Sequence, residues 1–210
     1  DGDYRIDAFA ADLRSVVAQL DDVPIIVGAS LGGMAALIAE GETREQVSSG
    51  LVLVDIAPRV EASGVARIVE FMTSNLDGFD SLEEAADAIA AYRPDRPRPI
   101  DLDGLSKNLR QRPDGRWRWH WDPAFMSVER GAASEGTGDR LEHAARRVDV
   151  PTLLVRGKRS DLLSESGAQH FLERVPHAQF VDVAGAGHMV VGDRNDAFAA
   201  AILGFVERVR

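Results

Sequence analysis

The stretch Gly28-Ala29-Ser30-Leu31-Gly32-Gly33 decides the fold. It follows the apolar run 23–27 and precedes the helical pattern 34–39, so the sequence predicts a strand, a sharp turn and a helix. In this context the G-x-S-x-G pattern indicates a nucleophilic serine, which a strained turn holds above the carboxyl end of a sheet. Such a strained turn requires neighbouring residues without bulky side chains. We expect Gly28, Gly32 and Gly33 to fulfil this requirement.

The turn by itself leaves two interpretations of Ser30. As a nucleophile, it directly precedes the N-terminus of the following helix, whose positive partial charge stabilises developing negative charge. As a capping residue, it is an ordinary serine in a glycine-rich strand-to-helix turn. A bare G-x-S-x-G arises often by chance, so residues further along the chain must decide.

A nucleophilic serine needs a base, and five histidines are available. His188 follows the strand-like run 179–183 and lies in the glycine-rich segment 184–188, where a catalytic base is expected. His143 and His170 fall in helical patterns and His177 lies beside a proline turn, so we interpret these three as solvated surface residues.

The base needs an acid to orient it, and two aspartates compete for this role. Asp161 lies in the loop that leaves the predicted strand 151–157, and Asp55 ends the predicted strand at 51–54. Both lie at carboxyl ends of strands, where ligand sites gather in open α/β sheets. We favour Asp161, because its strand directly precedes the strand before His188.

Ser30, Asp161 and His188 occur in the order Ser…Asp…His, each in a loop after a predicted strand. With these motifs the chain resembles the α/β-hydrolase superfamily, in its cap-bearing branch of esterases, cofactor-free haloperoxidase-like enzymes and carbon–carbon bond hydrolases. The serine in the turn disfavours the relatives that use aspartate there, the haloalkane dehalogenases and epoxide hydrolases. The segments that carry the resemblance are Gly28–Gly33, Leu53–Pro58, Gly157–Asp161 and Gly185–His188.

Hydrophobic periodicity gives the expected architecture, an α/β fold with a mostly parallel sheet flanked by helices. The predicted strands lie at about 24–29, 50–55, 151–156 and 178–183. The predicted helices of this part lie at about 5–20, 31–40, 165–174 and 195–208. We expect residues 1–57 and 139–210 to form the hydrolase core, with the site residues, and residues 58–138 to form an inserted cap.

The expected cap carries Trp117, Trp119 and Trp121, whose alternation predicts one face of a strand. They either line an apolar acyl or ring pocket or pin the small cap onto the hydrolase core, and the second role is slightly favoured for at least two of them. Residues 92–121 also have a local charge of +4. A solvated surface explains this charge most simply, and steering of a carboxylate-bearing substrate is the weaker alternative.

The resemblance implies further strands before Ser30, together with a loop that supplies one oxyanion-hole amide. Here the chain begins near the end of the family's fourth strand, so we expect a fragment of a longer protein, and poor solubility for residues 1–210 alone. Leu31 N–H is the one oxyanion donor that this sequence offers.

Composition narrows the function classes. The chain has 210 residues, 45% of them hydrophobic, which suits one domain with an insertion. It has no cysteine, so disulfides and thiolate metal sites are excluded, and we expect a cytoplasmic protein. A net charge of −10 argues against nucleic acid or an anionic membrane as partner, and self-association into a homo-oligomer is left open.

The expected function is a serine hydrolase that cleaves an ester, thioester or related small-molecule acyl substrate without a cofactor or metal. The same triad also serves carbon–carbon bond hydrolysis, perhydrolysis, or a small-molecule receptor that turns over slowly. The sequence does not name the substrate.

Overall fold

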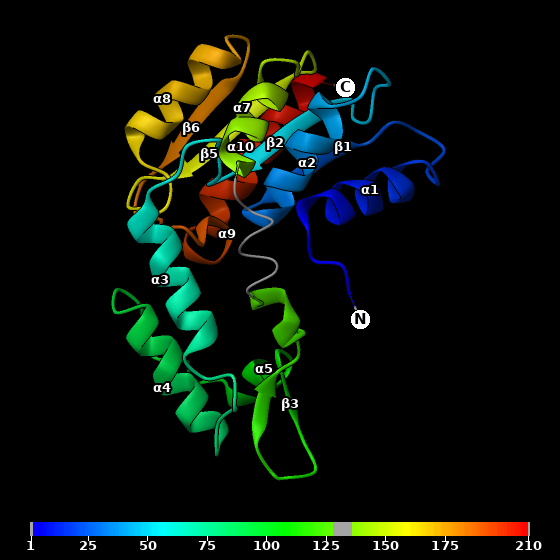
Figure 1. Cartoon of the computed structure of the whole chain (residues 1–210). Helices are drawn as coiled ribbons and strands as arrows, with labels where there is room; N and C mark the ends of the chain where they lie inside the picture. Colours follow the sequence, from blue (N-terminus) through cyan, green and yellow to red (C-terminus); the bar gives the residue numbers. More distant parts are fainter. Residues whose placement is uncertain (1, 128–135, 210) are drawn as a thin grey trace. The chain divides into compact units, whose positions relative to one another are not determined.

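The computed structural model describes residues 2–127 and 136–209 (Figure 1). The chain divides into two compact units, Asp1–Val65 with Ala132–Arg210, and Ala66–Gly131. The second unit lies within the range 58–138 expected for a cap. Its action as a lid stays a prediction, and positions 128–135 of that range lie outside the described residues.

A four-stranded sheet forms the centre of the first unit, and all its neighbouring strands are parallel. Across the sheet the order is β1 (Ile25–Ala29), β2 (Gly50–Val54), β5 (Thr152–Gly157) and β6 (Gln179–Val183). The predicted strands agree with these bounds to within one residue at each end. The apolar character of all four strands predicts burial on both faces, and β2 and β5 confirm it, since they are buried throughout. The prediction is wrong for the outer strands β1 and β6, which are partly exposed.

The strand register brings the functional segments to one edge of the sheet. Ala29 lies opposite Val54, and Val54 lies opposite Val155. Because parallel strands end at the same edge, the loops that follow all four strands meet there, where open α/β sheets bind ligands.

Helices cover both faces of this sheet (Figure 1). On one face, Phe205 of α10 (Asn195–Val209) packs in one buried cluster with Val52 and Val54. On the other face, Leu53 lines a small apolar void together with residues of α2 (Leu31–Gly41) and α7 (Thr137–Ala145). The alternation of side chains along β2 produces this division. The remaining helices of the unit are α1 (Ile6–Val17), α8 (Glu165–Arg174) and α9 (Val190–Asp193).

The second unit has its own small core around Phe79. Helix α3 (Ala62–Thr73) leads into it, followed by α4 (Leu82–Tyr92), α5 (Leu102–Ser106), the hairpin of β3 (Leu109–Gln111) and β4 (Trp117–Trp119), and the short 3₁₀ helix η1 (Pro123–Met126). Ser81 caps the N-terminus of α4, because its hydroxyl accepts the Glu84 amide at 3.2 Å.

The tryptophans of this unit do not share one strand face. β4 ends at Trp119, so the expected alternation through Trp121 is wrong. Trp117 and Trp119 pack against the core of the unit, and the Trp119 ring meets Phe79 edge-on at 5.6 Å between centroids. The Trp121 ring meets Phe125 at 6.5 Å. Trp117 and Trp119 thus pack within the second unit itself. Attachment of the cap to the hydrolase core and substrate binding by any of the three both stay predictions.

Candidate active site

Ser30 occupies a strained turn between β1 and α2. Its backbone has φ 49° and ψ −120°, a conformation rare for residues with a side chain. Its hydroxyl makes no hydrogen bond to the first turn of α2, so the structure does not support the interpretation as a capping serine. The side chain is partly exposed at the carboxyl edge of the sheet.

Two glycines permit this turn by close backbone packing. A Cβ on Gly28 would lie 2.6 Å from the carbonyl oxygen of Gly32, and one on Gly33 would lie 2.4 Å from the Ile56 side chain. A Cβ on Gly32 would meet nothing within 4 Å, so the expectation that all three glycines are needed for space is wrong for Gly32.

Leu31 is the first residue of α2. Its N–H is one of the leading amides of the helix, which have no acceptor within the helix and lie at the positive end of its dipole. Directly after Ser30 in the chain, this amide suits binding of an oxyanion.

Asp55 directly follows β2 and is fully buried, with 0% of its surface exposed. Like Ser30, it has a positive φ, 51°. Its Oδ1 accepts the Gly157 amide at 2.8 Å, and its Oδ2 accepts the Ser160 hydroxyl at 2.5 Å and lies 2.8 Å from His188 Nδ1. The carboxylate thus has three donors and no contact with bulk water.

His188 reaches Asp55 because its loop crosses the end of β5. The carbonyl oxygen of Gly187 would lie 2.1 Å from a Cβ on Gly157, so only glycine allows the two backbones to pass this closely. A carboxylate can only accept, so Nδ1 carries the proton and Nε2 is left as the acceptor, the form a general base needs. The His188 side chain is 14% exposed.

The acid assigned from the sequence therefore has to be corrected. The carboxylate bonded to His188 belongs to Asp55, not to Asp161. Asp161 lies four residues beyond the end of β5, has an exposed side chain, and its carbonyl packs against Gly64 at the start of α3. The argument from strand order failed because the loop of His188 extends past β5 to β2.

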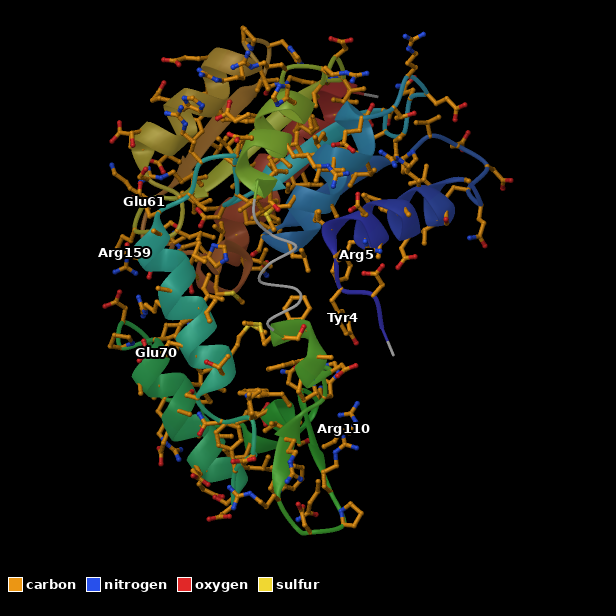
Figure 2. The ribbon with its side chains drawn as sticks, viewed as in Figure 1. Tyr4, Arg5, Glu61, Glu70, Arg110 and Arg159 are labelled. Atoms are coloured by element: carbon orange, nitrogen blue, oxygen red, sulfur yellow. The ribbon has the colours of Figure 1, made fainter. Side chains whose placement is uncertain are left out.

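Several contacts hold the loop 184–188 in place. The Asp193 carboxylate accepts the Gly187 amide at 2.8 Å, directly before His188. Arg159, in the loop after β5 (Figure 2), donates from its amide to Ala186 O at 2.8 Å and from its guanidinium to Gly185 O at 2.7 Å. Sequence reasoning missed both residues, because their partners are backbone atoms, which no side-chain pattern indicates.

Three other histidines form their hydrogen bonds with groups other than Asp55. His143 Nδ1 is 2.8 Å from the Asp139 carbonyl, and His177 Nε2 is 3.0 Å from the Val150 carbonyl. His170 is buried and its Nε2 bonds to Glu142, so its interpretation as a solvated surface residue is wrong. Among the described residues, no group of three or more His, Cys, Asp or Glu side chains is arranged to hold a metal ion.

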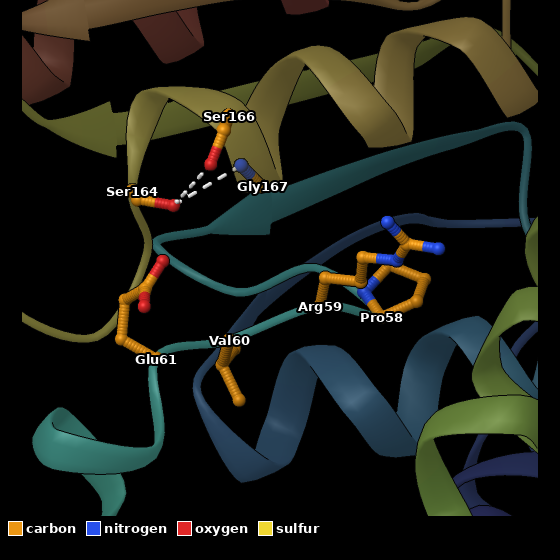
Figure 3. Close-up of a pocket in the computed structure, with 7 residues that line it drawn as sticks. All are labelled: Pro58, Arg59, Val60, Glu61, Ser164, Ser166 and Gly167. Carbon is orange, nitrogen blue, oxygen red and sulfur yellow. Dashed lines mark hydrogen bonds between the residues drawn. The ribbon is translucent and has the colours of Figure 1, made fainter.

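A separate surface pocket of about 440 Å³ lies beside the segments that leave β2 and lead into α8 (Figure 3). Among its lining residues, the Ser164 hydroxyl accepts the Gly167 amide at 3.1 Å, which caps α8. Ser30, Asp55 and His188 do not line this pocket. Its lining residues are Pro58, Arg59, Val60, Glu61, Ser164, Ser166 and Gly167. No helix in residues 2–127 or 136–209 is long and apolar enough to cross a bilayer.

Comparison with known proteins finds a family of hydrolases and relatives that are named hydrolases. Residues 1–201 match the family model described as "Alpha/beta hydrolase family". The 2-(acetamidomethylene)succinate hydrolase of Mesorhizobium japonicum is 26% identical over 208 residues, which cover 97% of this chain and 72% of that protein. The 3-hydroxybutyrate-oligomer hydrolase of Cupriavidus necator is 26% identical over 196 residues, 88% of this chain and 66% of that protein. The chain thus spans about two thirds of the latter's length.

Solved structures show the same fold. The crystal structure of E-2-(acetamidomethylene)succinate hydrolase superposes with a TM-score of 0.84 at 23% identity, over 98% of this chain and 75% of that one. An esterase of Mycobacterium tuberculosis superposes with a TM-score of 0.75 at 26% identity, over 99% of this chain and 69% of that one.

Proposed function

Because this chain belongs to the α/β-hydrolase family and has its fold, we propose that it cleaves an ester, thioester or related acyl bond with Ser30 as nucleophile. Hydrolytic activity is what the names of its relatives share. One observation supports the serine mechanism: the hydrogen bond of His188 to buried Asp55, at the sheet edge where strained Ser30 directly follows β1.

In this mechanism the proton of the Ser30 hydroxyl passes to His188 Nε2 while the oxygen attacks the substrate carbonyl. Asp55 holds Nδ1–H and so fixes the tautomer, and its charge stabilises the imidazolium that forms. Leu31 N–H donates to the oxyanion, and protonated His188 then gives its proton to the leaving group. Water, activated by the same histidine, releases the acyl group and restores Ser30.

The choice of an acyl substrate is supported by the relatives. One curated relative is named an esterase, from Escherichia coli, with 27% identity over 203 residues, 93% of this chain. Solved structures of similar fold include a thioesterase domain, with a TM-score of 0.70 at 23% identity. We further propose that the second unit, residues 66–127 of the described part, acts as the cap and selects the substrate.

A fluorophosphonate probe tests the nucleophile, because it labels only an activated serine. We expect covalent labelling of the native chain and none of Ser30→Ala. The matched control is Ser74→Ala, since Ser74 is an exposed serine of α3's C-terminal end and should leave labelling unchanged. Equal labelling of native protein and Ser30→Ala would remove Ser30 as the nucleophile. Labelling of Ser30 without steady-state turnover of p-nitrophenyl esters would instead indicate a receptor.

A further inference from the structure

Ser160 lies in the turn after β5 and has three hydrogen-bond partners. Its Oγ accepts the amides of Leu162 at 3.2 Å and Leu163 at 3.1 Å. The same oxygen lies 2.5 Å from Asp55 Oδ2. The side chain is partly buried, next to the fully buried carboxylate.

These contacts fix the direction of the Ser160 hydroxyl. A serine oxygen has two lone pairs and one proton, and a backbone amide can only donate. Both lone pairs are therefore occupied by the amides of Leu162 and Leu163, and the single proton is left for Asp55 Oδ2. The hydroxyl cannot turn away without breaking all three bonds. Because the turn fixes the Ser160 hydroxyl, this hydroxyl fixes the position of the Asp55 carboxylate.

Asp55 Oδ2 is also the atom that binds His188 Nδ1, while Oδ1 is held by the Gly157 amide. Both oxygens are therefore fixed by groups of β5 and the turn that follows it. We propose that Ser160 is a positioning residue, which orients Asp55 so that Oδ2 receives the Nδ1 proton of His188. This inference rests on the proposed serine mechanism and assigns a role in it to a residue that touches neither substrate nor nucleophile.

No charged side chain of β5 or of the described turn after it is bonded to Asp55, so the positioning of this carboxylate falls to Ser160. In the described part of the chain, His188 is the only titratable side chain bonded to Asp55. Arg156 of β5 is buried, but its guanidinium is bonded to Leu163 O at 2.8 Å and to Asp182 at 3.1 Å. Lys158, Arg159 and Asp161 of the turn have exposed side chains.

The test compares Ser160→Ala with Ser164→Ala. Ser164 caps α8 four residues later and accepts the Gly167 amide, so its loss removes a local serine-to-amide bond without touching Asp55. With a p-nitrophenyl ester, we expect Ser160→Ala to lower kcat about 10- to 100-fold with little change in KM. Ser164→Ala should keep the native kcat.

The pH profile of kcat/KM separates positioning from a merely structural role. A carboxylate relieved of one donor attracts a proton, on itself or on His188, more strongly. The acid limb of the Ser160→Ala profile should therefore move to higher pH. Ser160→Thr keeps a hydroxyl and should restore both kcat and the native profile.

Ser160→Cys carries the test if Ser160→Ala does not fold, because a thiol is a weaker donor of similar size. A native kcat and native acid limb in the Ala or Cys variant would overturn the positioning role while leaving Ser30 as nucleophile. Continued fluorophosphonate labelling of Ser30→Ala would instead overturn the serine mechanism itself, so the two failures are distinguishable.

Discussion

Ser30 and Asp55 are the two described residues other than glycine with a positive φ, and they follow neighbouring strands. Such backbone strain costs of the order of 1–3 kcal/mol at each position and persists only where the surroundings impose it. Around Ser30 the imposing contacts are the close packing of Gly28 against the start of α2. Around Asp55 they are the three donors that hold its carboxylate. The two residues with this backbone conformation are the nucleophile and the acid of the proposed mechanism.

The acid assignment can be tested directly by comparing two aspartates. Asp55→Asn should place an amide N–H against His188 Nδ1 or force the wrong tautomer, so turnover should fall by orders of magnitude. The same change in the serine-protease triad costs about 10⁴-fold in kcat. Asp161→Asn is the matched control and should stay within about threefold of native turnover, as for an exposed side chain. Steady-state kinetics with a p-nitrophenyl ester measures both, and a larger loss in Asp161→Asn would refute the assignment of Asp55.

At the level of elements, the sequence was sufficient for the sheet and insufficient for the acid. The apolar runs of β2 and β5 predict buried parallel strands, because burial on both faces leaves a local composition signal. The pairing of His188 with Asp55 spans 133 positions and depends on a loop that crosses β5. No local pattern encodes that crossing, although Gly157 and Gly187 at the close approach are its trace in the sequence.

Gly157→Ala tests whether this crossing governs the site. Its Cβ would meet the Gly187 backbone at 2.1 Å, so the loop 184–188 has to move away from β5. We expect His188 to lose its bond to Asp55 and turnover to drop at least about tenfold, with the sheet retained by far-UV circular dichroism. Gly204→Ala is the control, because a Cβ there meets only the flexible end of Arg208 at 3.5 Å. Native turnover in Gly157→Ala would show that the crossing is not needed.

A partly buried acid, Glu142, links helices α7 and α8. Glu142 of α7 bonds to His170 and, at 3.0 Å, to Arg174, both of α8. Burial by itself raises the pKa of Glu142, but the hydrogen bonds and charges of His170 and Arg174 outweigh it and hold that pKa below its ordinary value. Its contribution to stability is therefore present above the ordinary carboxyl pKa and is lost as the pH falls through the lowered one.

Glu142→Gln should accordingly lower the free energy of unfolding by about 1–3 kcal/mol near pH 7. The difference from the native protein should shrink as the pH falls below roughly 4, because the native carboxyl is then protonated as well. Urea denaturation at a series of pH values measures this. Glu173→Gln is the control, since Glu173 pairs with Arg174 from an exposed position and should change stability little at any pH. A pH-independent loss in Glu142→Gln would contradict the ionic role.

For the whole molecule, β1 forms an edge of the sheet in the described residues. Its Val27 is 47% exposed, although its strand neighbour Val52 is fully buried. An apolar strand with one unpaired side is a template for pairing with another chain. The sequence also predicted poor solubility of the isolated chain, and the edge position of β1 gives a structural reason for that expectation.

Val27→Lys tests this liability in the 210-residue chain. A charge on the edge strand should reduce self-association, measured by light scattering over a range of protein concentrations. Val16→Lys is the control, because Val16 is 57% exposed on α1 and lies on no strand edge. Equal reduction by both variants would point to general hydrophobic association, and a native chain that stays monomeric at high concentration would refute the prediction.

The segment that follows Asp55 belongs to the first unit up to Val65. Between Asp55 and Val65 the chain stays tied to the first unit: the Glu61 amide donates to Leu162 O at 2.8 Å, and Gly64 packs against the Asp161 carbonyl. The second unit begins only at Ala66. The donors that hold the Asp55 carboxylate all belong to the first unit, so we expect sequence changes confined to residues 66–127 to leave those hydrogen bonds in place.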